Sequence, residues 1–190
     1  RVFADNPIVR VTIPSDIYHD SFYIFDKDSG AVSGGFRYVL LNGSAVITGC
    51  SDICPNDLII PSTINGHNVS TIGFDAFKNA ELTSVYIPIG VTKIQNGAFW
   101  GNQLSSIVIP NSVTDIGIYA FYSNQLNNIA IPDSVTNLGA GAFGYNLLTN
   151  ITIPDSVNSL GGSVFVGNQL TTVNMPNSLT SIGYSAFAYN

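Results

Sequence analysis

From Pro88 onward the sequence repeats itself every 22 residues. Two successive copies, NSVTDIGIYAFYSNQLNNIAIP and DSVTNLGAGAFGYNLLTNITIP, show the unit, and its landmarks keep one register to the end of the chain. A coil of this length cannot bury its own apolar face, so each coil must stack on the next. The sequence therefore predicts a solenoid of stacked coils. The landmarks are Pro88, Pro110, Pro132, Pro154 and Pro176; Ile72, Ile94, Ile116, Leu138, Leu160 and Ile182; and Phe77, Phe99, Phe121, Phe143, Phe165 and Phe187.

Apolar spacing within one repeat predicts where the strands lie. Leu104, Ile107 and Ile109 hold the first, fourth and sixth positions of a segment whose second half has the period of two that is typical of a strand. The proline that follows cannot donate to a ladder, so it should end the strand, and successive strands should form a short-stranded parallel sheet. Val113 and Ile116 leave room for a second extended piece on the opposite side of the coil. The expected strands end at Pro61, Pro88, Pro110, Pro132, Pro154 and Pro176.

The repeated phenylalanines are expected to fill the centre of the coils. The motif Gly-x-x-Ala-Phe, as in Gly117 to Phe121, supplies a turn, a small residue and an aromatic ring. Because a solenoid core requires an inward column in every coil, we interpret these rings as core and not as a ligand-binding box. The asparagines that follow them should bond their side-chain amides to backbone groups of adjacent coils. This column comprises Asn79, Asn102, Asn124, Asn146, Asn168 and Asn190.

The residues before the array are expected to cap it. Gly34 to Thr48 alternates apolar and polar residues around Asn42-Gly43, a pair typical of two-residue hairpin turns. We therefore predict a β-hairpin that covers the first coil, since an uncapped solenoid end exposes core and strand edges.

The sequence also predicts a division of the chain into three parts. Phe3, Asn6 and Pro14 have the spacing that the later coils show between phenylalanine, asparagine and proline, which indicates the end of a preceding coil over residues 1–14. Residues 15–57 are then an insert with the capping hairpin, and residues 58–190 are the array. Because the chain stops at Asn190 in nearly the same phase, we expect both ends to be cuts in a longer array. The raw end should fray over Gly183 to Asn190, or associate end to end with another molecule.

Cys50 and Cys54 are the two cysteines of the chain. A structural zinc site needs about four ligands, and His19 and His67 do not form a spaced partner pair. A redox-active pair usually has two intervening residues beside a strand-helix unit, and neither feature is found here. We therefore predict a disulfide that closes a small loop, which fits an oxidising, extracellular compartment.

Composition and charge exclude several classes of function. Only 9% of the residues are charged, the net charge is -6, and no lysine or arginine lies beyond Lys93. Nucleic acids and anionic membranes both require a basic face, and no apolar run of roughly eighteen residues is available for membrane insertion. The sequence contains no nucleophile elbow, phosphate loop or zinc-protease motif. We therefore expect no catalytic residues, no cofactor and no metal, and a protein that is not an enzyme.

The run IPxSVTxIGxxAFxxNQLTxIxIP resembles the BspA-like class of leucine-rich repeats, found in secreted and surface proteins of bacteria and some parasitic protists. The resemblance covers Leu58 to Asn190, and GFRYVLLNGSAVITGC is similar to the leader of such arrays. Departures are Gln95 for glycine, Val164 for alanine, and five extra residues around Asn65 to Asn68, which should lengthen a loop. The resemblance implies a leucine-rich-repeat solenoid at the cell surface or outside the cell, with a role in binding or adhesion.

Two functions fit these expectations. The first is a binding or adhesion module that recognises a protein or a glycan through exposed strand positions, because these are polar but almost uncharged. The second is a passive spacer or stalk within a larger surface protein. An ice-binding solenoid would need a regular threonine grid, which the mixed residues do not supply. The candidate binding positions are Thr83, Ser84 and Tyr86; Ser105, Ser106 and Val108; Asn127, Asn128 and Ala130; Thr149, Asn150 and Thr152; and Thr171, Thr172 and Asn174.

Overall fold

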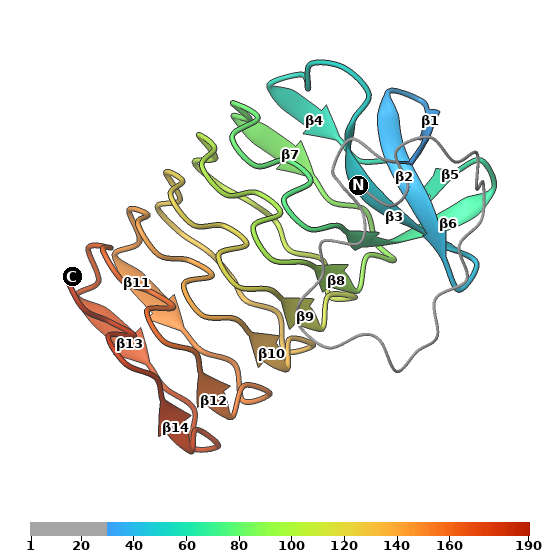
Figure 1. Ribbon diagram of the computed structural model, residues 1–190. Coiled ribbons are helices and arrows are strands. Elements are labelled where there is room, and N and C mark those ends of the chain that lie inside the picture. Colours follow the sequence, from blue (N-terminus) through green and yellow to red (C-terminus); the bar gives the residue numbers. More distant parts are fainter. Residues whose placement is uncertain (1–29) are drawn as a thin grey trace, which may run out of the picture.

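The computed structural model describes residues 30–190, which form a solenoid of stacked coils (Figure 1). Its regular elements are all strands, and the stack runs from a capping sheet at the N-terminal side to the coil that holds the C-terminus. The predicted leucine-rich-repeat solenoid is confirmed. The preceding coil expected over residues 1–14, and the first part of the insert, lie outside the described residues, so the division at residues 14 and 57 stays a prediction.

The cap is the predicted hairpin. Strands β2 (Phe36–Leu41) and β3 (Ser44–Cys50) pair antiparallel, and β1 (Ala31–Ser33) adds to the far edge of β2. Asn42 and Gly43 form the turn with φ values of 50° and 80°, the left-handed conformation that such a pair adopts readily. The hairpin therefore offers the edge of β3 to the first coil.

The five extra residues of the first coil form a second small hairpin. Strands β5 (Thr63–Ile64) and β6 (His67–Ile72) pair antiparallel around Asn65 and Gly66. The Asn65 side chain donates to the Tyr38 hydroxyl at 2.7 Å and accepts from the Ser33 hydroxyl at 2.9 Å. The longer loop predicted here is thus an ordered element that is tied to the cap.

A row of parallel strands runs along one side of the coils, and we call it the lower strand row. In it, β6 pairs with the cap strand β3 and then with β8 (Lys93–Ile94), so cap and array share one sheet. The row comprises β6, β8, β9 (Asp115–Ile116), β10 (Asn137–Leu138), β12 (Ser159–Leu160) and β14 (Ser181–Ile182), of which β8 to β14 follow the lower edge of the stack in Figure 1.

The opposite side carries the upper strand row, which is interrupted. Strands β4 (Asp57–Ile59) and β7 (Ser84–Tyr86) pair with each other, as do β11 (Asn150–Thr152) and β13 (Thr172–Asn174). Residues 105–108 and 127–130, between these pairs, are not strands. The expected strands before Pro110 and Pro132 are therefore wrong. The longest continuous sheet is in the lower row, from β6 to β10, and β12 and β14 pair separately.

Burial explains why the fold survives this interruption. In the coil before Pro110 the side chains of Leu104, Ile107 and Ile109 are buried, whereas Val108 points to solvent. The apolar side chains are thus buried as the pattern predicts, although the backbone forms no regular ladder of hydrogen bonds here. Between the two coils the Asn127 backbone N–H donates to the Ser105 carbonyl at 3.4 Å, which is long for such a bond. Side-chain packing, and not ladder bonding, therefore holds these segments.

The phenylalanine column forms the core as predicted. Successive rings from Phe77 to Phe187 are stacked with centroids 5.3 to 5.9 Å apart. The first five rings are 1% exposed or less, and Phe187, in the last coil, is partly buried. On the cap side, Phe36 of β2 meets Phe77 edge-on at 6.5 Å, so the hairpin closes the column.

The asparagine ladder is confirmed from Asn102 onward. The Asn102 amide donates to the carbonyls of Phe77 and Phe99 at 2.8 and 2.9 Å, and its oxygen accepts from the Leu82 backbone N–H at 3.0 Å. Equivalent bonds are made by Asn124, Asn146, Asn168 and Asn190.

Asn79 does not belong to this ladder, and its inclusion was wrong. It follows Phe77 by two residues and not by three, and its side chain is exposed. Ala80 stands at the ladder position of the first coil. Since Phe77 begins the column in the described residues, an amide at position 80 would lack the second acceptor of the ladder, the backbone carbonyl of a column phenylalanine in a preceding coil.

Candidate binding surface

The upper strand row presents the candidate positions to solvent. All fifteen are exposed, and we call the surface that they form the upper strand face. It comprises Thr83, Ser84, Tyr86, Ser105, Ser106, Val108, Asn127, Asn128, Ala130, Thr149, Asn150, Thr152, Thr171, Thr172 and Asn174. Strand register aligns those of β11 and β13, since Asn150 pairs with Thr172 and Thr152 with Asn174.

The upper strand face changes character along the array. Near the cap, the position before the buried pre-proline residue holds apolar side chains, with Ile59, Tyr86 and Val108 exposed at 72%, 56% and 82%. In the coils that end at Pro154 and Pro176 the same position holds Thr152 and Asn174. The face therefore runs from apolar to polar, a gradient that the initial description as polar and almost uncharged overlooked.

Some of the polar groups on this face are already bonded within the chain. Asn174 donates its amide to the Thr152 hydroxyl at 3.2 Å, and the Thr171 hydroxyl donates to the Thr149 carbonyl at 3.2 Å. At the cap end, the hydroxyls of Thr83 and Ser84 donate to the Asp57 carboxylate at 3.2 and 2.7 Å. A ligand would have to share these groups or use their remaining acceptor positions.

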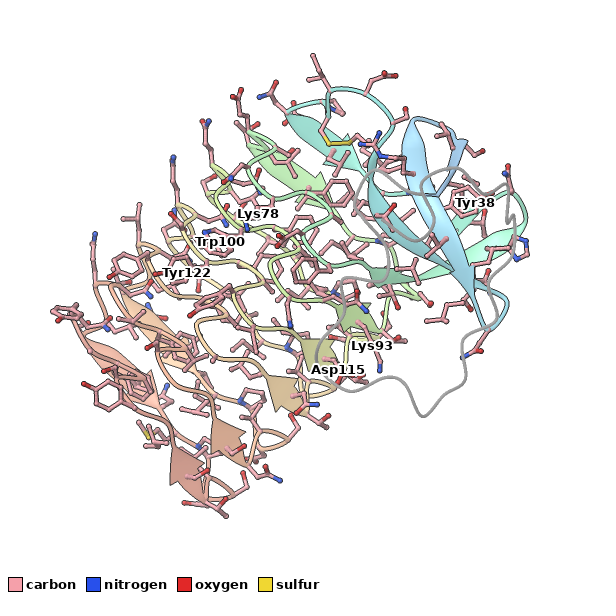
Figure 2. All side chains as sticks on the ribbon, viewed as in Figure 1. Tyr38, Lys78, Lys93, Trp100, Asp115 and Tyr122 are labelled. Carbon is pink, nitrogen blue, oxygen red and sulfur yellow. A yellow bond between two sulfur atoms is a disulfide. The ribbon has the colours of Figure 1, made fainter. Side chains whose placement is uncertain are left out.

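In the lower strand row, polar side chains form hydrogen bonds with neighbouring coils. The hydroxyls of Thr92 and Thr136 donate to backbone carbonyls of the preceding coil at 3.2 and 3.4 Å. The Asp115 carboxylate accepts from the Thr114 hydroxyl at 2.6 Å and from the Asn137 amide at 3.1 Å. Lys93 and Asp115 lie on neighbouring coils along this edge (Figure 2). The threonine and serine hydroxyls of the repeated Ser-Val-Thr motif thus bond each coil to the preceding one.

A group of aromatic side chains lies on the remaining side of the coils, around the phenylalanine turns. We call Trp100, Tyr119, Tyr122 and Tyr145 the aromatic cluster. Neighbouring rings in it have centroids 5.0 to 5.5 Å apart, in tilted or edge-on arrangements. Lys78 places its ammonium group 4.1 Å from the centre of the Trp100 ring, and Figure 2 shows Lys78, Trp100 and Tyr122 in a line across successive coils.

Packing in the aromatic cluster affects its chemistry. Burial raises the pKa of the Tyr122 hydroxyl, and the neighbouring phenols of Tyr145 and Tyr119 raise it further. Sequence reasoning missed the cluster because its members hold three different positions relative to the core phenylalanine. Trp100 and Tyr122 follow it directly, Tyr119 precedes it by two residues, and Tyr145 follows it by two. Comparing whole coils, and not single columns, would have revealed them.

The predicted disulfide between Cys50 and Cys54 is present, with the two Cα atoms 5.4 Å apart. Arg37 donates from its guanidinium group to the Ser51 carbonyl at 3.0 Å and so holds the closed loop against β2. The loop presents Ile53 to solvent with 97% of its surface exposed.

Within residues 30–190, no three potential metal-ligating side chains lie together. The same part of the chain contains no helix with the length and apolar character needed to cross a membrane.

Comparisons with known proteins agree with the observed fold. Residues 70–190 match the family model described as BspA type leucine rich repeat region, in six copies. The chain is similar to a leucine rich cell surface protein of Faecalibacterium prausnitzii A2-165, with 27% identity and a TM-score of 0.69, over 86% of this chain and 53% of that one. It thus spans about half the length of that protein. A leucine rich repeat protein of T. pallidum has the same fold, with 24% identity, a TM-score of 0.65, and coverage of 82% of this chain and 86% of that one. No curated protein sequence matches the chain.

Proposed function

Because the chain belongs to the family of BspA-type leucine-rich repeats, whose fold serves as a scaffold for protein interactions, we propose that it is an extracellular binding or adhesion module and not an enzyme. It recognises a protein or a glycan through the upper strand face. The observation that supports this most directly is the exposure of all fifteen candidate positions, which recur in successive coils without a charged side chain among them. Such a surface favours hydrogen bonding and apolar contact over electrostatic capture.

The gradient along the upper strand face favours an extended ligand that lies parallel to the array. Apolar groups of the ligand would pack on Tyr86 and Val108, which are exposed near the cap. Its polar groups would bond to Thr152 and Asn174 in the later coils. A ligand in the reverse direction would place polar groups on the apolar half and lose that match.

The proposal is tested with purified matrix proteins and an array of neutral glycans. A variant with Tyr86, Val108, Thr152 and Asn174 changed to alanine should lose binding to the ligand that the unaltered protein captures. The matched control changes Ser159 and Ser181, exposed residues of the lower strand row, to alanine. Equal loss in both variants, or unchanged binding in the first, would refute the assignment of this face.

A passive spacer is the second candidate function. The internal bonds of Thr171 and Asn174, which occupy part of the hydrogen-bonding capacity of the face, favour it. The stacked phenylalanine column would give such a spacer its stiffness. Capture of no ligand by the unaltered protein in the same assay supports the spacer and counts against the binding module.

Location outside the cell is part of the proposal. The Cys50–Cys54 disulfide supports it, because such bonds persist in oxidising compartments. A similar protein from F. prausnitzii is described as a cell surface protein.

End-to-end self-association stays a prediction. The last coil exposes Ile182, Tyr184 and Tyr189, which could contact another molecule. Sedimentation should detect association, and hydrogen exchange should show weak protection over Gly183 to Asn190 in the monomer. Strong protection of this coil in a monomeric sample would contradict the prediction.

A further inference from the structure

The aromatic cluster is built across coils by pairing each tyrosine with a glycine one coil later. Tyr119 lies over Gly141, where an added methyl group would collide with its ring. A methyl group at Gly144 or Gly167 would lie 2.9 Å from ring carbons of Tyr122 or Tyr145 respectively. Each of these glycines stands 22 residues after its tyrosine. The rings are therefore seated in fixed positions, and a ligand would not have to order them.

Two of these tyrosines occupy backbone positions that favour glycine. Tyr119 and Tyr145 have φ values of 56° and 51°, in the left-handed region. Other coils place Gly97, Gly141, Asp75, Ser163 and Ser185 at the position of Tyr119, and Gly101, Gly167, Asn79, Ser123 and Tyr189 at that of Tyr145, all with positive φ. The left-handed conformation is thus a regular feature of the repeat at both positions, and a bulky side chain there costs backbone energy that glycine does not.

Charge indicates what the cluster would bind. Residues 94–190 contain three aspartates and no lysine or arginine, so their formal side-chain charge is -3. The chain itself places one cation on the cluster, the Lys78 ammonium group, which lies 4.1 Å from the Trp100 ring centre and is ion-paired with the Asp75 carboxylate at 3.1 Å. Tyr119 and Tyr145 remain 39% and 50% exposed, with no cationic residue of their own coils near them in the sequence. Nucleic acid bases would also stack on such rings, but their phosphates would meet an acidic protein.

The geometry points to the aromatic cluster as a docking site for arginine or lysine side chains of a partner polypeptide. The cationic group would lie against the electron-rich faces of Tyr119 and Tyr145, as Lys78 does on Trp100, while its methylene groups cover the ring edges. This surface is separate from the upper strand face, and the inference does not depend on the function proposed there.

Trp100 makes the inference directly testable, because it is the single tryptophan of the chain and belongs to the cluster. The purified protein is titrated with a peptide of repeating Arg-Gly-Ser units, and tryptophan emission is followed. The reference peptide carries glutamine in place of every arginine. We expect the arginine peptide to change the emission saturably, and added salt to weaken the binding. The glutamine peptide should leave the emission unchanged.

The test variants use the residue that other coils already have. Tyr119→Gly and Tyr145→Gly should each weaken the arginine peptide about two- to fivefold, and the double variant about tenfold, since one exposed cation–ring contact has this magnitude. Both changes suit the backbone, and urea unfolding checks that the fold is kept. The matched control is Tyr189→Gly, which removes an exposed tyrosine with a φ of 58° at the repeat position of Tyr145, in the last coil.

The results separate a cation site from other uses of the cluster. Unchanged affinity in the double variant, an equal loss in Tyr189→Gly, or no binding of the arginine peptide at millimolar concentration would each overturn the inference. So would equal binding of the glutamine peptide, or of neutral oligosaccharides that change the Trp100 emission, because ring stacking without charge would then be the basis of recognition.

Discussion

The asparagine ladder offers a sharp test of how the coils are held together, through the substitution Asn124→Ala. Asn124 is 8% exposed, and its oxygen accepts from the Leu104 backbone N–H at 3.2 Å. Its amide nitrogen donates to the carbonyls of Phe99 and Phe121 at 2.9 and 3.2 Å. One side chain thus joins two coils by three hydrogen bonds in the interior.

The loss of unfolding free energy depends on which hydrogen bonds the partners of Asn124 retain after the substitution. The Leu104 N–H would be left buried without an acceptor, which costs about 1–3 kcal/mol. The two carbonyls suffer less, since Phe99 still accepts from Asn102 at 2.9 Å and Phe121 from Asn146 at 3.0 Å. Each lost bond of that kind is worth about 0.5–1.5 kcal/mol. We therefore expect Asn124→Ala to lower the free energy of unfolding by about 3 kcal/mol.

The chain contains its own control at the last rung of the ladder. Asn190 makes the same three bonds, with Leu170, Phe165 and Phe187, but it is exposed. Water can replace the amide there, so Asn190→Ala should cost less than about 1 kcal/mol. Equilibrium urea unfolding followed by circular dichroism measures both values, provided that the slopes agree. If the two variants lost the same free energy within about 0.5 kcal/mol, burial would not be the origin of the ladder's strength.

Three further predictions concern other parts of the molecule. Replacing Cys50 and Cys54 by serine opens a loop of about five residues and should lower the free energy of unfolding by about 2 kcal/mol, as urea unfolding with and without reductant will show. Gly139→Ala should destabilise the array by about 1–3 kcal/mol in the same assay, because the added methyl would lie 2.5 Å from backbone atoms of Gly117 and Ile118. The Tyr122 hydroxyl has a raised pKa in the folded state, so it stabilises the fold below the ordinary tyrosine pKa, and that contribution is lost as pH rises. Tyr122→Phe should therefore reduce the loss of stability with rising alkaline pH in urea unfolding, and the absorbance titration should lose one tyrosine with a raised pKa.

The parts of the fold that sequence predicts are those set by burial. The column from Phe77 to Phe165 and the hairpin at Asn42-Gly43 were predictable because each rests on a local pattern with one physical solution. The ladder asparagines were predictable from their period for the same reason, and Asn79 was misplaced only because its spacing from Phe77 is one residue short.

Other features depend on distances between coils, which no single repeat encodes. The break in the upper strand row is of this kind, since residues 105–108 keep the apolar pattern of a strand and lack its ladder. The aromatic cluster also depends on contacts between coils. The rings of Tyr122 and Tyr145 lie against Gly144 and Gly167 of the following coils, where a larger residue would displace them. A search for aromatic residues followed by glycine 22 residues later would have found it.

The upper strand face and the aromatic cluster are formed by residues of the same coils. Trp100 and Val108 belong to one coil, and Tyr119, Tyr122 and Ala130 to the next. The residues that fix the repeat point inward or bond to adjacent coils, so the outward positions are the ones at which coils can differ without loss of the fold. In the coil after Pro154 those positions hold small or polar residues, among them Gly167, Thr172 and Asn174. Small and polar residues are ordinary on a solvent-exposed surface. On the upper strand face and in the aromatic cluster, apolar and aromatic side chains occur between residues 86 and 145, where solvation alone does not favour them, and the last coil exposes a separate group, Ile182, Tyr184 and Tyr189. Binding through these two surfaces should therefore be concentrated in the coils before Pro154, and the coil after it should contribute length and polar contacts.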